Sequence, residues 1–250
     1  MGYGRDIIKS LKRVPPLYAI LQKIHKVLFL GPTLQERMMR ILNKQQTVFF
    51  VQVGANDGVK ADPIHELIVG NKNWCGIFIE PIAPLFYRLK KNYEYSERFI
   101  FENIAIGTKK ETKKFYYVSD QAALDPSLNL PFYYDQLGSF DRDHIFKHLG
   151  DKIAPFIVEE EMECVSLQEA LDRNHITAID LLHIDAEGFD YQVLAQLDFA
   201  RYRPLVILFE HKHLPTEEAL KAKSLLETSG YRLFRYDGDT LAIRRGFIRF

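Results

Sequence analysis

Residues 48–58, VFFVQVGANDG, decide the fold of this chain. The first six are almost all apolar, which is typical of a central strand buried on both faces of a sheet. The run ends at Gly54, and another glycine follows at Gly58, so the backbone can turn sharply and approach a ligand without a Cβ in the way. We predict a strand over residues 48–53 and a ligand-binding turn over residues 54–58.

Strands and helices alternate after this turn. Apolar runs predict further strands over residues 74–79, 99–104, 179–184, 205–209, 231–236 and 240–244. Helices are predicted over residues 63–69, 84–93, 191–197 and 216–228, and after Ser166, which forms a capping-box pair with Glu169. This alternation indicates an α/β domain with a mostly parallel sheet and helices on both faces. Asp237 and Gly238, between the last two strands, are typical of a hairpin turn.

Residues 107–162 interrupt the alternation. They contain one strand-like piece, residues 115–118, in a long irregular stretch rich in tyrosine, phenylalanine and aspartate. Long loops in compact domains are usually functional, so we predict that this insertion covers the substrate. Its aromatic residues Phe132, Tyr133 and Tyr134 either hold a sugar or aromatic acceptor or pack the loop down.

The first 46 residues differ from the rest in charge. They carry nine lysines and arginines against Asp6 and Glu36, whereas the whole chain has a formal net charge of zero. We predict a basic helical extension, residues 1–46, before one α/β domain, residues 47–250. An amphipathic helix after Pro16 packs on its own domain, on a second copy in a homodimer, or on a membrane surface. Neither a secretory signal nor a spanning segment is evident, so we expect a cytoplasmic protein.

A carboxylate ends the second predicted strand in GIFIEP, residues 76–81. Glu80 at this position can accept hydrogen bonds from both ribose hydroxyls of a nucleoside lying across the sheet edge. Together with the glycine turn, it favours a bound adenosine moiety. The turn lacks the G-x-G-x-x-G spacing of nicotinamide and flavin enzymes, because Asn56 replaces the second glycine.

Two more carboxylates, Asp185 and Glu187, follow the predicted strand 179–184. Residues two apart share a face while the chain stays extended, and two close carboxylates raise the pKa of one of them, which suits a general base. We predict that Asp185 accepts a hydroxyl proton. Three alternatives stay open: Glu187 stabilises a helix N-terminus, Asp185 contacts an amino group of the cofactor, or Asp185, Glu210 and His211 bind a divalent cation such as magnesium.

Four sequence blocks together carry a resemblance to a known family. They are FVQVGANDG (50–58), FIEP (78–81), NIAIG (103–107) and IDLLHIDAEG (179–188). The set resembles the FkbM-type methyltransferases. The resemblance implies a Rossmann-like seven-stranded methyltransferase sheet, whose last strand is antiparallel, and S-adenosylmethionine (SAM) as the cofactor.

The resemblance also implies roles for individual residues. Glu80, with Pro81 beside it, is expected to bind the ribose of SAM, and Asn103 and Ala105 to lie near the adenine. The methionine moiety is expected at the turn formed by Gly54, Ala55, Asn56, Asp57 and Gly58. His183 departs from the family, which commonly has a lysine there, so we group it with Asp185 and Glu187 as catalytic and expect a different substrate or pH optimum.

The substrate-binding residues are the least constrained by the sequence. The segment LGSF, residues 137–140, together with His144, resembles a family segment near the substrate, which indicates Ser139 and His144. We add Glu210 and His211 because they follow the strand next to Asp185. His211 and His213, two apart in a loop, are either a metal or proton-relay pair or ordinary surface residues.

We predict a SAM-dependent methyltransferase that methylates an oxygen of a small molecule, sugar or glycan. The balanced charge disfavours nucleic acid as a partner. Cys75 and Cys164 match no metal-ligand or disulfide pattern. The alternatives are a nicotinamide-dependent oxidoreductase and a non-catalytic domain that binds a partner through its basic helices.

Overall fold

The structure is a computed structural model that describes residues 31–94 and 96–247 of the chain. The chain divides into two units, Met1–Arg40 and Ile41–Phe250. Helix α3 comprises Leu34–Leu42. The remaining helices predicted in the basic extension, and the membrane or dimer contacts expected of them, lie outside the described residues. Within residues 31–94 and 96–247, no helix is long and apolar enough to cross a membrane.

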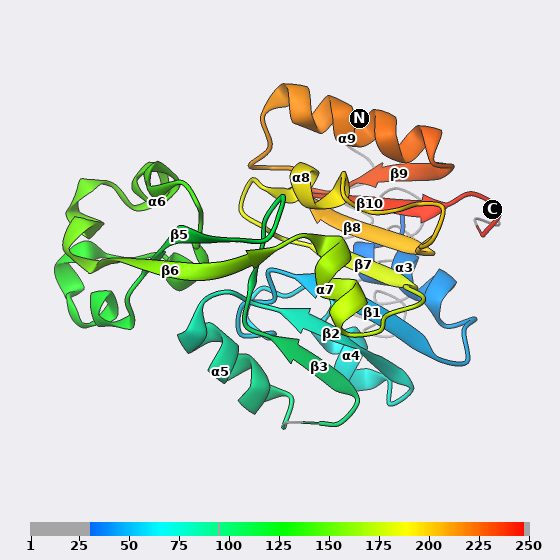
Figure 1. The fold of residues 1–250 in the computed structure, drawn as a ribbon, viewed down its shortest axis with the longest axis horizontal. Helices are drawn as coiled ribbons and strands as arrows, with labels where there is room; N and C mark the ends of the chain where they lie inside the picture. The colour runs from blue at the N-terminus through cyan, green and yellow to red at the C-terminus, as the bar shows by residue number, and fades with distance from the viewer. Residues whose placement is uncertain (1–30, 95, 248–250) are drawn as a thin grey trace, which may run out of the picture. The chain divides into compact units, whose positions relative to one another are not determined.

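The second unit is built on a seven-stranded sheet with the order β3-β2-β1-β7-β8-β10-β9. Its strands are β1 (Val48–Val53), β2 (Trp74–Ile79), β3 (Phe99–Glu102), β7 (Leu181–Ile184), β8 (Val206–Glu210), β9 (Tyr231–Arg235) and β10 (Asp239–Arg244). The pairs from β3 to β8 are all parallel. β10 is antiparallel to both of its neighbours, β8 and β9. The predicted Rossmann-like sheet with an antiparallel last strand is therefore confirmed (Figure 1).

Helices surround this sheet, as predicted. They are α4 (His65–Gly70), α5 (Ala83–Asn92), α7 (Leu167–Arg173), α8 (Asp190–Leu194) and α9 (Thr216–Thr228). Figure 1 shows α7 in front of the sheet and α4 behind it. At the start of α7 the Ser166 hydroxyl accepts a hydrogen bond from the Glu169 N–H at 3.1 Å, so the predicted helix cap is present.

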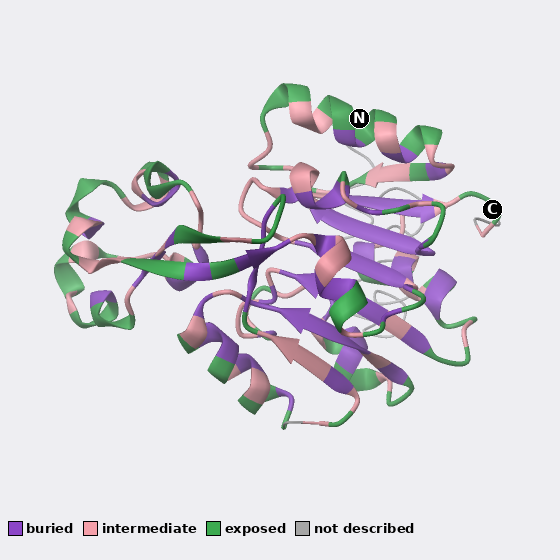
Figure 2. Cartoon of the chain, viewed as in Figure 1, coloured by how far each residue is buried: buried purple, intermediate pink, exposed green. Residues whose placement is uncertain are grey.

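The central strands are buried on both faces (Figure 2). In β1, five of six residues are buried, which explains the nearly continuous apolar run in the sequence. Phe50 packs edge-on against Phe78 of β2, with ring centroids 4.9 Å apart, and both rings contact Phe99 of β3. Each buried ring contributes about 1.5–3 kcal/mol of hydrophobic stabilisation. These contacts pack β1, β2 and β3 together, and the ends of β1 and β2 contribute to the site described below.

Residues 107–162 are more regular than the sequence indicates. β5 (Glu111–Val118) and β6 (Ile157–Val165) form an antiparallel pair that projects from the main sheet, and β4 (Ala105–Ile106) pairs with β6. Between them lie α6 (Arg142–Leu149) and short 3-10 helices. The prediction that this stretch is irregular is wrong for β6. Its acidic residues 159–161 are all exposed, so the sequence there lacks the alternation of apolar and polar residues that indicates a strand. We call residues 107–165 the arm.

Candidate functional site

The end of β1 approaches the end of β7 too closely for a side chain between them. Gly54 has φ of +76°, and a Cβ on it would lie 1.7 Å from the Asp185 carbonyl oxygen. Its N–H donates to the Ile79 carbonyl at 3.0 Å, and the Asp185 N–H donates to the Val53 carbonyl at 2.9 Å. The glycine therefore lets three strand ends, β1, β2 and β7, meet at one point.

The end of β2 presents a buried carboxylate. Glu80 is 2% exposed, and its oxygens accept hydrogen bonds from the backbone N–H of Asn56 at 2.7 Å and of Ile82 at 2.8 Å. Burial raises the pKa of Glu80 to about 7, although these two hydrogen bonds act in the opposite direction. The Asn103 amide donates to the Glu80 and Pro81 carbonyls, both at 2.8 Å, and so braces this turn from outside.

The ends of β7 and β8 are tied together by one buried side chain. Asp190 accepts hydrogen bonds from the N–H groups of Ala186 and Gly188, each at 3.3 Å, and of Glu210 at 3.2 Å. This holds the turn after β7, in which Glu187 has a left-handed φ of +47°, against the end of β8. Burial, and next the carboxylates of Glu187 and Asp190, raise the pKa of Asp185 well above its usual range.

Three histidines from two elements meet above Glu187. His144 and His148 of α6 and His213 of the loop after β8 have ring centroids 4.7–5.5 Å apart. The His144 Nε2 lies 3.0 Å from a Glu187 carboxylate oxygen. Helix α6 of the arm therefore closes over the ends of β7 and β8, with imidazole facing carboxylate.

A cavity of about 320 Å³ runs along this edge of the sheet. Gly54, Glu80 and Asp185 line it from the ends of β1, β2 and β7. The arm lines the opposite side with aromatic, hydroxyl and cationic groups, among them Phe115, Ser139, Phe140, His144 and Lys147. One continuous space thus joins a nucleoside-type subsite to a mixed aromatic and polar subsite, at the edge of the sheet where α/β proteins bind ligands.

The model of the methyltransferase FkbM domain matches residues 52–235. The chain belongs to the FkbM methyltransferase family. The predicted membership is confirmed, and it makes the protein a methyltransferase whose family fold implies SAM as the methyl donor. The match includes every strand end that lines the cavity.

Solved structures resemble this FkbM domain only distantly. They include cofactor-bound Rv0187 from MTB (12% identity, 96% of this chain and 95% of that chain, TM-score 0.44). Another is precorrin-6y C5,15-methyltransferase from Geobacter metallireducens GS-15 (10%, 83% and 86%, 0.40). A third is the fibrillarin pre-rRNA processing protein from Methanococcus jannaschii (13%, 81% and 68%, 0.43). No curated protein matches the chain.

The residues of the FkbM domain fit SAM at the three strand ends. The Gly54 turn leaves backbone exposed to the cavity, which suits close approach of the methionine moiety. Each Glu80 oxygen already accepts one backbone hydrogen bond and keeps a lone pair for a ribose hydroxyl. Ile79, Ile104 and Ile106 add an apolar wall for the adenine.

The structure brings most of the predicted site residues to the cavity. The predicted residues that line it are Gly54, Asn56, Glu80, Pro81, Ala105, Ser139, His144, Asp185 and Glu187. Those that shape the site from behind are Ala55, Asp57, Gly58 and Asn103. Their roles toward SAM and the acceptor stay predictions.

Three predicted residues lie elsewhere. His183 is 3% exposed beside Gln52 of β1, and its buried Nδ1 has no hydrogen-bond partner among the described residues. His211 turns toward β10, where its Nδ1 lies 3.1 Å from the Thr240 hydroxyl. Glu210 reaches His213 rather than His211. Of the two histidines that the sequence offered as a metal or proton-relay pair, only His213 reaches the cavity, because the loop after β8 directs it there.

Removing the Asn103 brace is expected to weaken SAM binding about tenfold. Asn103→Ala frees the two carbonyls that the amide holds, at a cost of about 1–2 kcal/mol to the ordered turn around Glu80. Calorimetric titration with SAM measures the effect. The matched control is Asn73→Ala, whose amide braces the Gln46 carbonyl at 2.7 Å. Equal affinity in both variants would contradict the role of the brace.

SAM affinity is expected to fall as the pH drops through about 7. Protonation turns one Glu80 oxygen into an O–H donor and removes the charge that strengthens hydrogen bonds to the other, and the pKa of Glu80 in the folded protein is about 7. Because that pKa is raised, the folded state takes up a proton more readily than the unfolded chain, so the Glu80 contribution to the stability of the fold decreases as the pH rises toward 7.

Titration with adenosine, which lacks the methionine amine, isolates the effect of Glu80 protonation on ligand binding. Constant adenosine affinity from pH 6 to 8 would refute it.

Proposed function

We propose that this FkbM domain transfers the methyl group of SAM to a hydroxyl oxygen on a sugar, glycan or other small natural product. The observation that supports it is that one cavity is lined both by Glu80 and by residues of the arm, with Asp185 also in its wall. When bound, SAM supplies an electrophilic methyl group on a sulfonium. Transfer then requires alignment of the acceptor oxygen and removal of its proton.

The side chains of the arm support a hydroxylated acceptor. Phe140 packs edge-on against Phe189, with ring centroids 5.6 Å apart, and both rings line the cavity. Aromatic faces bind the apolar faces of sugar rings, whereas Ser139 and Lys147 can hydrogen-bond to hydroxyl groups. A nucleic-acid acceptor is not part of the proposal, because the chain has no net positive charge.

Asp185 is the residue that we propose accepts the acceptor's proton. It lines the cavity at the end of β7, beside Glu187, whose carboxylate also meets His144. A divalent cation such as magnesium is a further part of the proposal, since it would polarise the same hydroxyl. The carboxylates at the ends of β7 and β8 support the proposal of a cation, because carboxylate oxygens are common ligands of divalent cations.

The test is transfer of a radiolabelled methyl group from SAM to a panel of saccharides and glycans, with amine acceptors for comparison. Asp185→Asn is expected to lower kcat by about 100-fold or more, which is the usual contribution of a general base. The control is Asp180→Asn, just before the same strand, where the carboxylate caps the Phe49 N–H at 2.9 Å. Methyl transfer to amines alone, or equal rates in both variants, would contradict the proposal.

A nicotinamide-dependent reaction is the alternative that the sequence left open. The FkbM match over residues 52–235 favours methyl transfer over it. The alternative of a non-catalytic domain predicts that SAM does not bind at all, which the same preparations can show.

A further inference from the structure

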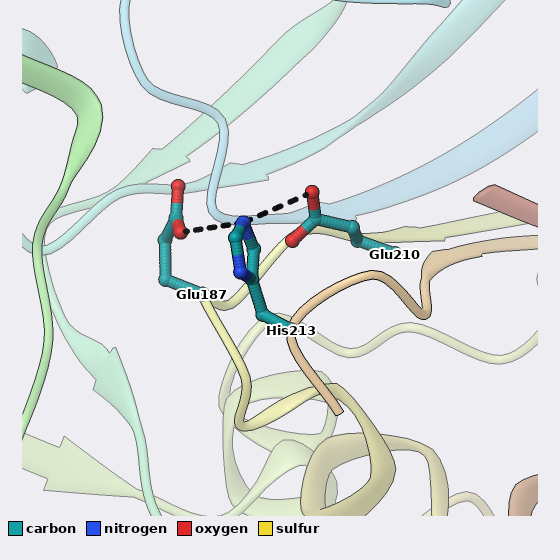
Figure 3. A group of neighbouring side chains, drawn as sticks. All are labelled: Glu187, Glu210 and His213. Carbon is teal, nitrogen blue, oxygen red and sulfur yellow. Dashed lines mark ion pairs between the residues drawn. The ribbon is translucent and has the colours of Figure 1, made fainter. Parts of the chain in front are cut away.

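Glu187, Glu210 and His213 converge at the ends of β7 and β8. Figure 3 shows the two carboxylates on either side of the imidazole, both directed at its Nε2. The Nε2 lies 3.8 Å from a Glu187 oxygen and 3.6 Å from a Glu210 oxygen, and one donor atom from each residue falls within 4.8 Å of the others. Glu187 comes from the turn after β7, whereas Glu210 ends β8 and His213 follows three residues later, so the group joins two neighbouring strand ends.

These separations suit a shared ion better than hydrogen bonds. A nitrogen–oxygen hydrogen bond spans about 2.7–3.2 Å, which is shorter than both observed distances. Ligand atoms that each lie about 2.1 Å from one ion are separated by roughly 3–4 Å. The observed 3.6 and 3.8 Å fall in the second range.

The two carboxylates meet histidine side chains but no lysine or arginine in the described part of the chain. The side chains of Glu187 and Glu210 are 16% and 18% exposed. The second Glu210 oxygen is buried and accepts no hydrogen bond from any described residue.

The imidazole of His213 offers the nitrogen at the centre of the group. Its Nε2 is the atom that both carboxylates face, and an imidazole nitrogen is a common metal ligand. The surrounding contacts also position the ligands. His144 lies 3.0 Å from Glu187, and Asp190 accepts hydrogen bonds from the backbone at both strand ends, and contacts of this kind orient the ligands in metal sites.

We propose that Glu187, Glu210 and His213 bind one divalent transition-metal ion, with an open coordination position toward the cavity. Glu187 and His213 line the cavity, so the open position faces the acceptor subsite. The inference rests on the proposed function in one respect, namely that an acceptor hydroxyl occupies that subsite. Relative to the sequence prediction, His213 and Glu187 replace His211 and Asp185 as ligands.

The mixed donor set selects the class of metal. Magnesium and calcium prefer sites made of oxygen atoms, whereas imidazole favours first-row transition metals, and carboxylates accept manganese as well. Three protein ligands leave positions for water or substrate, which is the arrangement of a catalytic rather than a structural site. We therefore expect Mn²⁺ to bind more tightly than Mg²⁺.

The test is titration of the full chain with Mn²⁺. Binding is measured as the decrease in the electron paramagnetic resonance signal of the free ion. We expect one Mn²⁺ per chain, with an affinity that falls at least tenfold in His213→Gln and in Glu210→Gln. His211→Gln is expected to keep the wild-type affinity, because His211 contacts Thr240 instead. Thermal melting of each variant shows whether it is folded. If only one of His213→Gln and Glu210→Gln folds, that variant alone is enough to test the site.

SAM titration of the same preparations separates the two proposals. If SAM binds but Mn²⁺ does not, or if Mn²⁺ binds equally to wild type, His213→Gln and Glu210→Gln, the metal site is contradicted while the proposed function stands. If the affinity falls in His211→Gln but not in His213→Gln, the ligand assignment is overturned. If SAM does not bind either, the proposed function fails as well.

Discussion

Replacing Gly54 by alanine is expected to destabilise the protein by about 2–5 kcal/mol and to abolish SAM binding. The new methyl group would overlap the Asp185 carbonyl oxygen at 1.7 Å, and backbone atoms of two buried strands cannot move apart cheaply. Part of the cost is the left-handed conformation at φ of +76°, which a residue with a Cβ rarely adopts. Urea denaturation measures the loss of stability.

Gly230→Ala separates the cost of the steric overlap from the cost of the left-handed conformation. Gly230 has φ of +88°, but a Cβ there would meet nothing within 4 Å. It is therefore expected to cost only the conformational strain of about 1–2 kcal/mol and to leave SAM binding intact. Equal stability of the Gly54 and Gly230 variants would show that the ends of β1 and β7 do not approach as closely as described.

Glu80→Gln is expected to weaken SAM binding by roughly 100-fold or more. The substitution keeps the shape of the side chain but removes the charge, and each hydrogen bond to a charged group contributes about 1.5–3 kcal/mol. Two ribose hydroxyls make the expected loss about 3–6 kcal/mol. The amide NH₂ would also face the Asn56 or the Ile82 N–H, leaving one of these donors without an acceptor. Calorimetric titration with SAM measures the change.

The matched control for this variant is Glu102→Gln. Glu102 ends the neighbouring strand β3, and its carboxylate meets Arg173 and Asn174 outside the cavity. Its removal is expected to leave SAM affinity unchanged. A similar loss in both variants would mean that Glu80 acts through general stability rather than through the ribose.

The sequence predicted the parts of this site that follow buried strands. Gly54, Glu80 and Asp185 each come directly after an apolar run, and the carboxyl ends of parallel strands meet at one edge of a sheet. Their proximity therefore follows from the strand order alone. The antiparallel last strand was expected from the resemblance to the FkbM-type methyltransferases, and the hairpin turn at Asp237 and Gly238 agreed with it.

The arm and the His213 cluster were less predictable, for physical reasons. β6 is half exposed and acidic, so its pairing with β5 leaves little apolar pattern in the sequence. His213 reaches Glu210 only because the loop after β8 turns back on itself, and His144 comes from a helix in an insertion. Such meetings depend on loop conformation, which local sequence does not determine.

The most direct test of this account is calorimetric titration of the full chain with SAM at pH 8, where Glu80 is mostly ionised. The account predicts one SAM bound per chain, with the affinity reduced 100-fold or more in Glu80→Gln and unchanged in Glu102→Gln. Absence of SAM binding to the wild-type chain, or binding that Glu80→Gln leaves intact, would contradict it.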